Sequence, residues 1–455
     1  MVQDISLAIC GHAWHGKSTL LGKIVAETGM ATPREVEEAK QLAAEGRDAS
    51  LVFAQLVFRS KDVTERSSEA ARGVTILPSM VRFEFDEHRI TVIDTPGQET
   101  YANNRFFGMF QADCAMLVVD VDEGPKPITH QVVRILKGFE IPVHAVVLTK
   151  MDRVDYREEP FRERVAELRL LLDDYGVPHE ETVFIPTSAY APNRDLMEPG
   201  EGIRGFRKID WFDGPSVHRF MAELTFAAIR PRSAPLRLAI HGSEVYDHVP
   251  GIGKTATALV ESGVVRPDMT LHFEPISAER KAPVTARVRS VQLTKGHFKT
   301  PGLPIAEGEP RQLIGVAFKN LSSKEPLREL FKGRGVLAGT TANPPSVAHA
   351  MEVELTVFDP DSLLRVGSVF TMHVHVDRAA ISIEEVLAKR EKDAAQWSEP
   401  VEQAIAPGEW GRVRVRVTNR PVAIEQADVL PPLSKFVLRE GNKAVAFGRC
   451  TRILE

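Results

Sequence analysis

The chain has 455 residues, 43% of them hydrophobic, and a formal net charge of −5, a composition typical of a soluble globular protein of about three domains. It contains no apolar run near the roughly 18 residues of a membrane helix and no signal-type segment at the N-terminus, which excludes a membrane partner and predicts a cytoplasmic location. Three widely separated cysteines, Cys10, Cys114 and Cys450, are expected to be buried structural thiols without a redox or metal role.

The first predicted strand, Ile5 to Cys10, leads into a segment with the pattern G-x-x-x-x-G-K-[ST]. Its glycines, Gly11 and Gly16, adopt backbone angles that let successive N–H groups face phosphates, while Lys17 reaches the β/γ oxygens and Ser18 binds Mg²⁺. The helix that begins there adds the positive end of its dipole. We therefore expect a nucleoside triphosphate site made by Gly11, His12, Ala13, Trp14, His15, Gly16, Lys17, Ser18 and Thr19.

Two side chains in this loop, those of Trp14 and His15, need a separate interpretation of their roles. The indole of Trp14 either covers the nucleotide and excludes water, or packs against the switch segment or another domain, and we favour packing. His15 is expected to be a loop residue and not a metal ligand.

The segment Asp94-Thr95-Pro96-Gly97-Gln98 follows a predicted strand, so Asp94 is expected to hold Mg²⁺ through water and the Gly97 N–H to contact the γ-phosphate. Upstream lies Arg72-Gly73-Val74-Thr75-Ile76. Its Thr75 is the natural second hydroxyl ligand of magnesium, ordered only while a γ-phosphate is present. Together these elements predict a nucleotide-dependent switch.

A third element, Thr149-Lys150-Met151-Asp152, also follows a predicted strand. The carboxylate of Asp152 accepts two hydrogen bonds from the guanine ring N–H and amino group, which adenine cannot donate, so the base is predicted to be guanine. Lys150 is expected to lie along the base, and the backbone N–H groups of Ser188 and Ala189 to approach the guanine oxygen.

Up to about residue 230 apolar strands alternate with amphipathic helices, which predicts an α/β P-loop GTPase domain with a mostly parallel sheet. Beyond a linker at residues 229–235, short Val-rich strands with Gly and Pro turns predict two β-barrels. We place the domains at residues 1–232 (GTP-binding domain), 233–345 (β-barrel domain 2) and 346–455 (β-barrel domain 3). Ile383 to Asp393 is predicted to be helical. Gly253-Lys254-Thr255 imitates the end of a phosphate loop, but His248 stands at the required first glycine, so Pro250-Gly251-Ile252-Gly253 is interpreted as a turn and not as part of a second phosphate loop.

In the last domain Arg412, Arg414 and Arg416 alternate with valines, which places three guanidinium groups on one face of a strand. They either contact RNA phosphates or form a solvated outer barrel face, and we favour the solvated face. The same interpretation applies to His373 and His375.

These motifs, with Gln111-Ala112-Asp113-Cys114-Ala115 and Pro431-Pro432-Leu433-Ser434-Lys435-Phe436, resemble the translational GTPases over essentially the whole chain, most of all elongation factor 1-alpha and its relatives in termination and ribosome rescue. The resemblance implies GTP/GDP and Mg²⁺ as cofactors and a monomer that works with the ribosome. It also implies either aminoacyl-tRNA or a release-factor-like protein as cargo, together with a nucleotide exchange factor.

The sequence departs from this family at its site. The family's phosphate loop reads Gly-His-Val-Asp-His-Gly-Lys, where this chain has Ala13 and Trp14, and Gln98 replaces the histidine that positions the attacking water. A glutamine amide also orients water, so we expect catalysis by Gln98 with Lys17 and Thr75. Thr149 replaces an asparagine whose amide braces the loop, which predicts weaker nucleotide affinity.

The leading hypothesis is a GTP-hydrolysing translation factor that delivers aminoacyl-tRNA to the ribosome. One alternative is a release or rescue GTPase that carries a protein partner. A second is a GTP-dependent binding module with little turnover, and a minor one is the GTPase subunit of a sulfate-activating enzyme.

Overall fold

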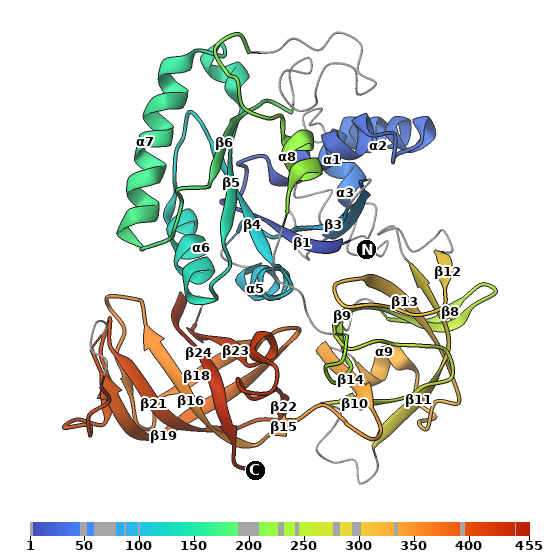
Figure 1. The fold of residues 1–455 in the computed structure, drawn as a ribbon, viewed down its shortest axis with the longest axis vertical. Helices are drawn as coiled ribbons and strands as arrows, with labels where there is room; N and C mark the ends of the chain where they lie inside the picture. Colours follow the sequence, from blue (N-terminus) through green and yellow to red (C-terminus); the bar gives the residue numbers. More distant parts are fainter. Residues whose placement is uncertain are drawn as a thin grey trace. The chain divides into compact units, whose positions relative to one another are not determined.

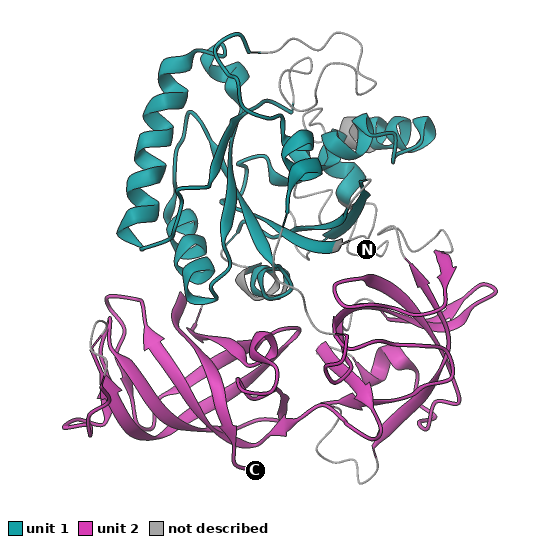
Figure 2. Cartoon of the chain, viewed as in Figure 1, with its two compact units in different colours: residues 1–228, 295–297 teal, residues 229–294, 298–455 magenta. Residues whose placement is uncertain are grey.

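The computed structural model describes most of the chain, namely residues 3–45, 52–58, 79–85, 88–98, 101–189, 209–225, 232–241, 245–275, 283–293, 302–331, 335–391, 396–441 and 443–455. The predicted switch segment 72–76 with Thr75, and residues 229–231 of the predicted linker, lie outside these ranges. The chain divides into two compact units, residues 1–228 with 295–297 and residues 229–294 with 298–455 (Figure 2). Among the described residues, none of the helices has the length and apolar character needed to cross a membrane.

A six-stranded sheet with the order β2-β3-β1-β4-β5-β6 forms the centre of the first unit. Every neighbouring pair is parallel except the antiparallel edge pair β2–β3, which confirms the predicted mostly parallel sheet. Every residue of β4 is buried, as expected for a central parallel strand covered on both faces. The strands are β1 (Gln3–Cys10), β2 (Ser79–Glu84), β3 (His88–Asp94), β4 (Cys114–Asp120), β5 (Val143–Thr149) and β6 (Val183–Pro186).

Helices cover both faces of this sheet (Figure 1). Helices α1, α3 and α8 share a hydrophobic core with the strands, and α5, α6 and α7 lie on the other face. The helical segments are α1 (Lys17–Glu27), α2 (Pro33–Glu45), α3 (Val52–Phe58), α5 (Ala102–Phe110), α6 (Pro127–Gly138), the 3-10 turn η3 (Met151–Val154), α7 (Glu158–Asp174) and α8 (Val217–Glu223). This arrangement leaves the carboxyl ends of β1, β3 and β5 free for the loops that carry the predicted motifs.

The second unit begins with an antiparallel sheet in the order β10-β14-β7-β9-β13-β11-β12, and an additional β10–β11 pairing closes it on itself. The hydrogen bond from the Ile252 N–H to the Val249 carbonyl forms a turn just before β9, which confirms the turn predicted at residues 250–253. The elements are β7 (Arg237–His241), β8 (Val245–Val249), β9 (Gly253–Ser262), β10 (Thr270–Glu274), β11 (Val284–Leu293), β12 (Leu303–Ile305), β13 (Leu313–Lys319), α9 (Leu327–Leu330) and β14 (Gly335–Thr340).

A closed antiparallel barrel in the order β16-β21-β19-β18-β23-β24 follows, so the two predicted barrels are both present. Its strands are β16 (Ala350–Val357), β18 (Val369–Val374), β19 (Asp377–Arg390), β21 (Trp410–Val417), β23 (Lys435–Glu440) and β24 (Lys443–Ile453). Shorter elements flank it, namely β15 (Val347–Ala348), β17 (Leu364–Arg365), β20 (Ala404–Ile405), β22 (Val422–Ala423) and the 3-10 turn η4 (Pro431–Leu433).

The helix predicted from Ile383 to Asp393 is wrong, because residues up to Arg390 belong to β19. Two register shifts against β21, after Ile383 and after Val386, each place an extra residue in β19. Such β-bulges break the two-residue alternation, so the buried residues Ile381, Ile383 and Val386 follow at intervals of two and three. Mixed intervals of this kind imitate the spacing of a helix face.

The two barrels are joined by a buried ion pair. Nε of Arg237 on β7 lies 2.6 Å from Oε1 of Glu425, and both side chains are 2% exposed. Arg237 also donates to both oxygens of Asn343, while Ser346 donates to Glu425 through its N–H and its hydroxyl. A charged pair with this many hydrogen bonds is satisfied without water.

The three cysteines are free and buried, as predicted. Burial raises the pKa of Cys10 to about 11 and that of Cys450 to about 12, so both remain protonated thiols at neutral pH.

Candidate nucleotide-binding site

The loop between β1 and α1 has the backbone of an anion-binding loop. Gly11 has a φ of +143°, and a Cβ atom there would come within 2.2 Å of the Val118 carbonyl oxygen on β4, so only glycine fits. Trp14 and Gly16 are left-handed, with φ angles of +66° and +92°. Left-handed residues between right-handed ones turn successive N–H groups toward one concave surface, the geometry that binds phosphate oxygens.

Lys17 supplies a buried positive charge beside this loop. Its side chain is almost fully buried, and its Nζ donates a 2.7 Å hydrogen bond to the His12 carbonyl. Burial lowers the pKa of Lys17 to about 8, against the opposing effect of the Asp94 carboxylate. A buried cation that donates a hydrogen bond to a neutral carbonyl suits a polyphosphate anion.

The two predicted magnesium residues of the described chain lie side by side. Ser18 begins α1 and Asp94 ends β3, and the Ser18 hydroxyl donates a 2.6 Å hydrogen bond to Oδ2 of Asp94. A hydroxyl and a carboxylate are oxygen ligands of the kind that Mg²⁺ prefers, so the donor set fits this ion. Thr75, the third predicted ligand, lies outside the described residues.

The segment after β3 packs directly against the phosphate loop. The Ala13 N–H donates a 3.1 Å hydrogen bond to the Gly97 carbonyl, and a Cβ atom at Gly97 would lie 2.4 Å from Nζ of Lys17. Only glycine permits this approach. Gln98 directly follows Gly97 and is therefore next to the loop, and its carbonyl accepts from the Tyr101 N–H at the start of α5.

Thr149, at the end of β5, braces the loop from the opposite side. Its hydroxyl lies 2.7 Å from the His15 carbonyl oxygen and 3.3 Å from that of Val119, and the shorter contact is the better hydrogen bond. The amide expected in this family is absent, but the threonine hydroxyl makes the link to the loop. The threonine hydroxyl thus supplies a brace of its own, and the weaker nucleotide affinity stays a prediction.

Asp152 and the segment after β6 lie together. The Ser188 hydroxyl donates to Oδ1 of Asp152, and the Met151 N–H donates to the Thr187 carbonyl at 3.2 Å. Ser188 and Ala189 are buried beside them. These contacts hold the predicted guanine-reading carboxylate in a fixed place.

Lys150 has a partner that sequence reasoning missed. Its Nζ lies 2.7 Å from Oδ2 of Asp120, the fully buried last residue of β4. Burial raises the pKa of Asp120, but the hydrogen bond and charge of Lys150 outweigh burial and hold that pKa below its usual value. The signal in the sequence was a single carboxylate at the end of the otherwise apolar run Cys114–Asp120. The pair anchors Lys150 in its left-handed backbone position, with a φ of +60°.

The loop histidines are neutral. His15 is fully buried, and burial followed by the charge of Lys17 lowers its pKa to about 3. Burial also lowers the pKa of His12, whose ring meets that of His15 edge-on with centroids 5.2 Å apart. At neutral pH the 4.0 Å approach of His15 to Glu123 is therefore no ion pair. No group of three potential metal-binding side chains of the His, Cys, Asp and Glu types occurs within the described ranges.

Trp14 is 54% exposed. The switch segment 72–76, one of the two partners expected for its packing, lies outside the described residues, so packing against it stays a prediction. The indole lies at the surface of the loop that carries the phosphate-binding N–H groups.

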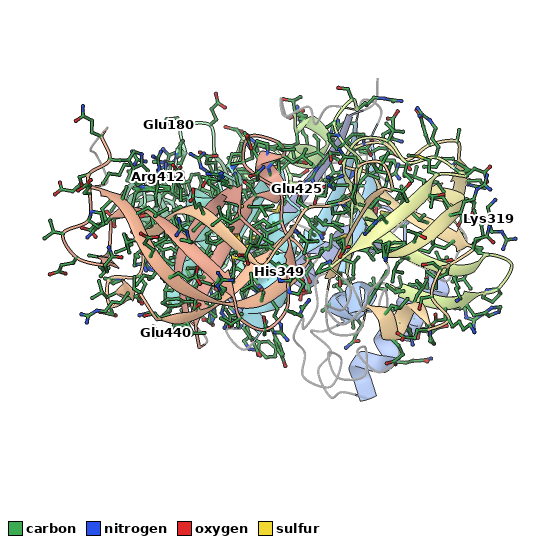
Figure 3. All side chains as sticks on the ribbon, turned by 90° about the horizontal axis from the view of Figure 1, so that it is seen from below. Glu180, Lys319, His349, Arg412, Glu425 and Glu440 are labelled. Carbon is green, nitrogen blue, oxygen red and sulfur yellow. The ribbon has the colours of Figure 1, made fainter. Side chains whose placement is uncertain are left out.

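The three arginines of β21 form a solvated outer face, as favoured. Each pairs with a glutamate, and Arg412, which is labelled in Figure 3, is joined to Glu354 at 3.0 Å. The Arg412 guanidinium also lies over the ring of Trp397. Arg414 pairs with Glu385 and Arg416 with Glu384. Neighbouring carboxylates therefore balance these charges, which disfavours phosphate binding.

The same interpretation is wrong for the histidines of β18 and the turn after it, because His373 and His375 are buried. Nε2 of His375 contacts the Ala423 carbonyl at 2.7 Å, while its Nδ1 accepts from the Val376 N–H. Burial lowers the pKa of His375 to about 4. Alternation predicts a shared face but does not tell which face is buried.

Similarity to known proteins extends over nearly the whole chain. Residues 3–216 match the family described as the elongation factor Tu GTP binding domain, and residues 350–451 match the family described as GTP-eEF1A C-terminal domain-like. Elongation factor 1-alpha of Natronomonas pharaonis is 30% identical over 450 residues, which cover 99% of this chain and 98% of that protein. Elongation factor 1-alpha of Archaeoglobus fulgidus is also 30% identical over 450 residues, covering 98% and 97%. The S. cerevisiae Ski7 GTPase-like domain, solved with GDP and inorganic phosphate, shares the fold with a TM-score of 0.73 at 17% identity, over 99% of this chain and 97% of that one.

Proposed function

Because the chain belongs to the elongation factor 1-alpha family of translational GTPases, we propose that its GTP-bound form delivers aminoacyl-tRNA to the ribosome. The observation that carries the proposal is the meeting of sequence-distant elements on one phosphate loop. The Ala13 N–H is hydrogen-bonded to Gly97 and the His15 carbonyl to Thr149. The loop is therefore linked both to the segment 94–98, which follows β3, and to the base-reading element, which follows β5.

Each residue of the site has one task in this proposal. Lys17 and the loop N–H groups bind the β- and γ-phosphates, while Ser18 and Asp94 would hold Mg²⁺. Bound Mg²⁺ neutralises phosphate charge. Gln98 orients a water molecule that attacks the γ-phosphorus, the bond to the β–γ bridging oxygen breaks, and GDP and phosphate leave.

Guanine selection is assigned to Asp152. Its carboxylate accepts from the ring N–H and the amino group of guanine, and the Ser188 hydroxyl fixes its orientation. Lys150, held by Asp120, lies along the base, and the N–H groups of Ser188 and Ala189 approach the guanine oxygen.

The conformational switch would involve Thr75, whose hydroxyl would be the second hydroxyl ligand of magnesium only while GTP, with its γ-phosphate, is bound. In this proposal residues 1–232 form the domain that binds GTP, and the barrel domains at residues 233–345 and 346–455 hold the cargo. The proposed partners are the ribosome, aminoacyl-tRNA and a nucleotide exchange factor, and the protein is expected to act as a cytoplasmic monomer.

The proposal is tested by protection of the aminoacyl ester. Aminoacyl-tRNA is mixed with the full chain loaded with a non-hydrolysable GTP analogue or with GDP, and spontaneous deacylation is followed. Slower deacylation with the analogue alone supports aminoacyl-tRNA as the cargo. Equal deacylation in both states would refute it, and GTP-dependent capture of a release-factor-like protein would then assign the alternative cargo.

A further inference from the structure

Trp14 occupies a fixed position on the phosphate loop although its side chain is exposed. The residue before it, Ala13, is buried and hydrogen-bonded to Gly97, and the residue after it, His15, is fully buried. With both neighbours anchored, the backbone of Trp14 has little freedom. The indole, 54% exposed, is therefore presented at the surface of the loop and not free to swing away with a mobile segment.

The backbone of Trp14 makes this choice of residue costly. Its φ of +66° lies in the left-handed region, which glycine, asparagine and aspartate tolerate and which a bulky side chain disfavours. Any residue at position 14 must adopt this conformation to keep the loop open for phosphate. A bulky aromatic residue in such an unfavourable backbone conformation, at a loop that binds a ligand, indicates that its side chain has a function there.

We propose that the Trp14 indole covers the outer side of the phosphate loop, shields the bound phosphates from water and slows the release of nucleotide. This inference rests on the proposed function, since it requires a guanine nucleotide in the loop. The surroundings favour such shielding: the rings of His12 and His15 are neutral, and the Lys17 charge is buried. Excluding water from such a site strengthens the contacts of the N–H groups and Lys17 with phosphate oxygens.

The experiment measures release of N-methylanthraniloyl-GDP from the full chain by stopped flow, with excess GDP as competitor. Trp14→Asn removes the indole but tolerates the left-handed backbone, and Trp14→Phe keeps an aromatic cover. Release from Trp14→Asn is expected to be about tenfold faster than from wild type, the effect of losing one partly buried aromatic contact. Release from Trp14→Phe is expected to stay within about twofold.

Energy transfer from tryptophan to the same fluorescent nucleotide gives a second readout, which reports whether the Trp14 indole lies close to the bound nucleotide. Transfer should fall in Trp14→Phe and persist in the matched control Trp397→Phe, whose indole lies in the last barrel against Arg412. Wild-type release rates in Trp14→Asn, or equally fast release from Trp14→Phe, would overturn the inference while leaving the proposed function intact. A wild-type chain that binds no guanine nucleotide would overturn both.

Discussion

The hydroxyl group of Thr149 donates a 2.7 Å hydrogen bond to the carbonyl oxygen of His15, so the first residue of the base-reading element holds the phosphate loop directly. Thr149 ends β5 and His15 lies in the loop after β1, two strands separated in the sheet by β4. A neutral hydrogen bond therefore connects the phosphate loop after β1 with the base-reading element after β5, although β4 lies between these two strands in the sheet.

This link predicts that Thr149→Val weakens GDP binding about tenfold, because the variant leaves a buried loop carbonyl without its donor. Thr149→Asn, which restores a donor, should recover most of the affinity. Isothermal titration with GDP measures both. The control is Thr182→Val, which removes a similar hydroxyl-to-carbonyl bond to Val143 in the same unit. Equal losses of affinity in Thr149→Val and Thr182→Val would contradict a specific brace.

Gln98→Ala is expected to lower GTP hydrolysis by at least about tenfold while GTP affinity stays within about twofold, because only the positioning of the attacking water is lost. Single-turnover phosphate release at saturating GTP, compared with equilibrium GTP binding, separates the two effects. An unchanged hydrolysis rate would remove Gln98 from the mechanism. The neighbouring Tyr101→Phe serves as a control for local disturbance at the start of α5.

Lys17 is predicted to destabilise the protein in the absence of nucleotide. Burial lowers its pKa from the usual 10.5 to about 8, so between pH 8 and 10.5 the unfolded chain binds more protons at this site than the folded one. The free energy of unfolding then rises with pH across that window, and the penalty is fully present below pH 8.

Lys17→Met should therefore abolish GTP binding yet stabilise the nucleotide-free protein at pH 7, by about 1–2 kcal/mol. The difference in free energy of unfolding between the variant and wild type should decrease as the pH rises from 8 toward 10.5. Urea unfolding of the nucleotide-free chain at several pH values measures it. A variant less stable than wild type at pH 7, or a difference that does not change with pH, would contradict the buried-charge account.

The pair Arg237–Glu425 predicts a large loss of stability when one partner is removed. Glu425→Ala leaves a buried guanidinium without its carboxylate and should destabilise the second unit by about 3–5 kcal/mol. Glu385→Ala breaks the exposed pair with Arg414 and should cost under about 1 kcal/mol. Denaturation curves of both variants provide the comparison, and similar effects in the two would show that the buried pair is not a major contributor.

Several features of the fold and site followed from local sequence patterns. The strands with continuous apolar runs, such as β4, and the glycines of the phosphate loop were predictable because burial and backbone angle act on single residues. The bulged strand β19 was not, because its extra residues change the apolar spacing into one that resembles a helix. The link of Thr149 to His15 and that of Lys150 to Asp120 join segments whose proximity depends on strand order, which no local pattern reveals.

The most direct test of the proposed function is single-turnover phosphate release from the complex of this protein, GTP and aminoacyl-tRNA on programmed ribosomes. The proposal predicts that ribosomes with the matching codon in the decoding site accelerate phosphate release by at least about a hundredfold over the free complex. It also predicts that a mismatched codon gives little acceleration and that Gln98→Ala suppresses the response. Phosphate release that is unaffected by ribosomes, or accelerated equally whatever the codon, would contradict the delivery of aminoacyl-tRNA.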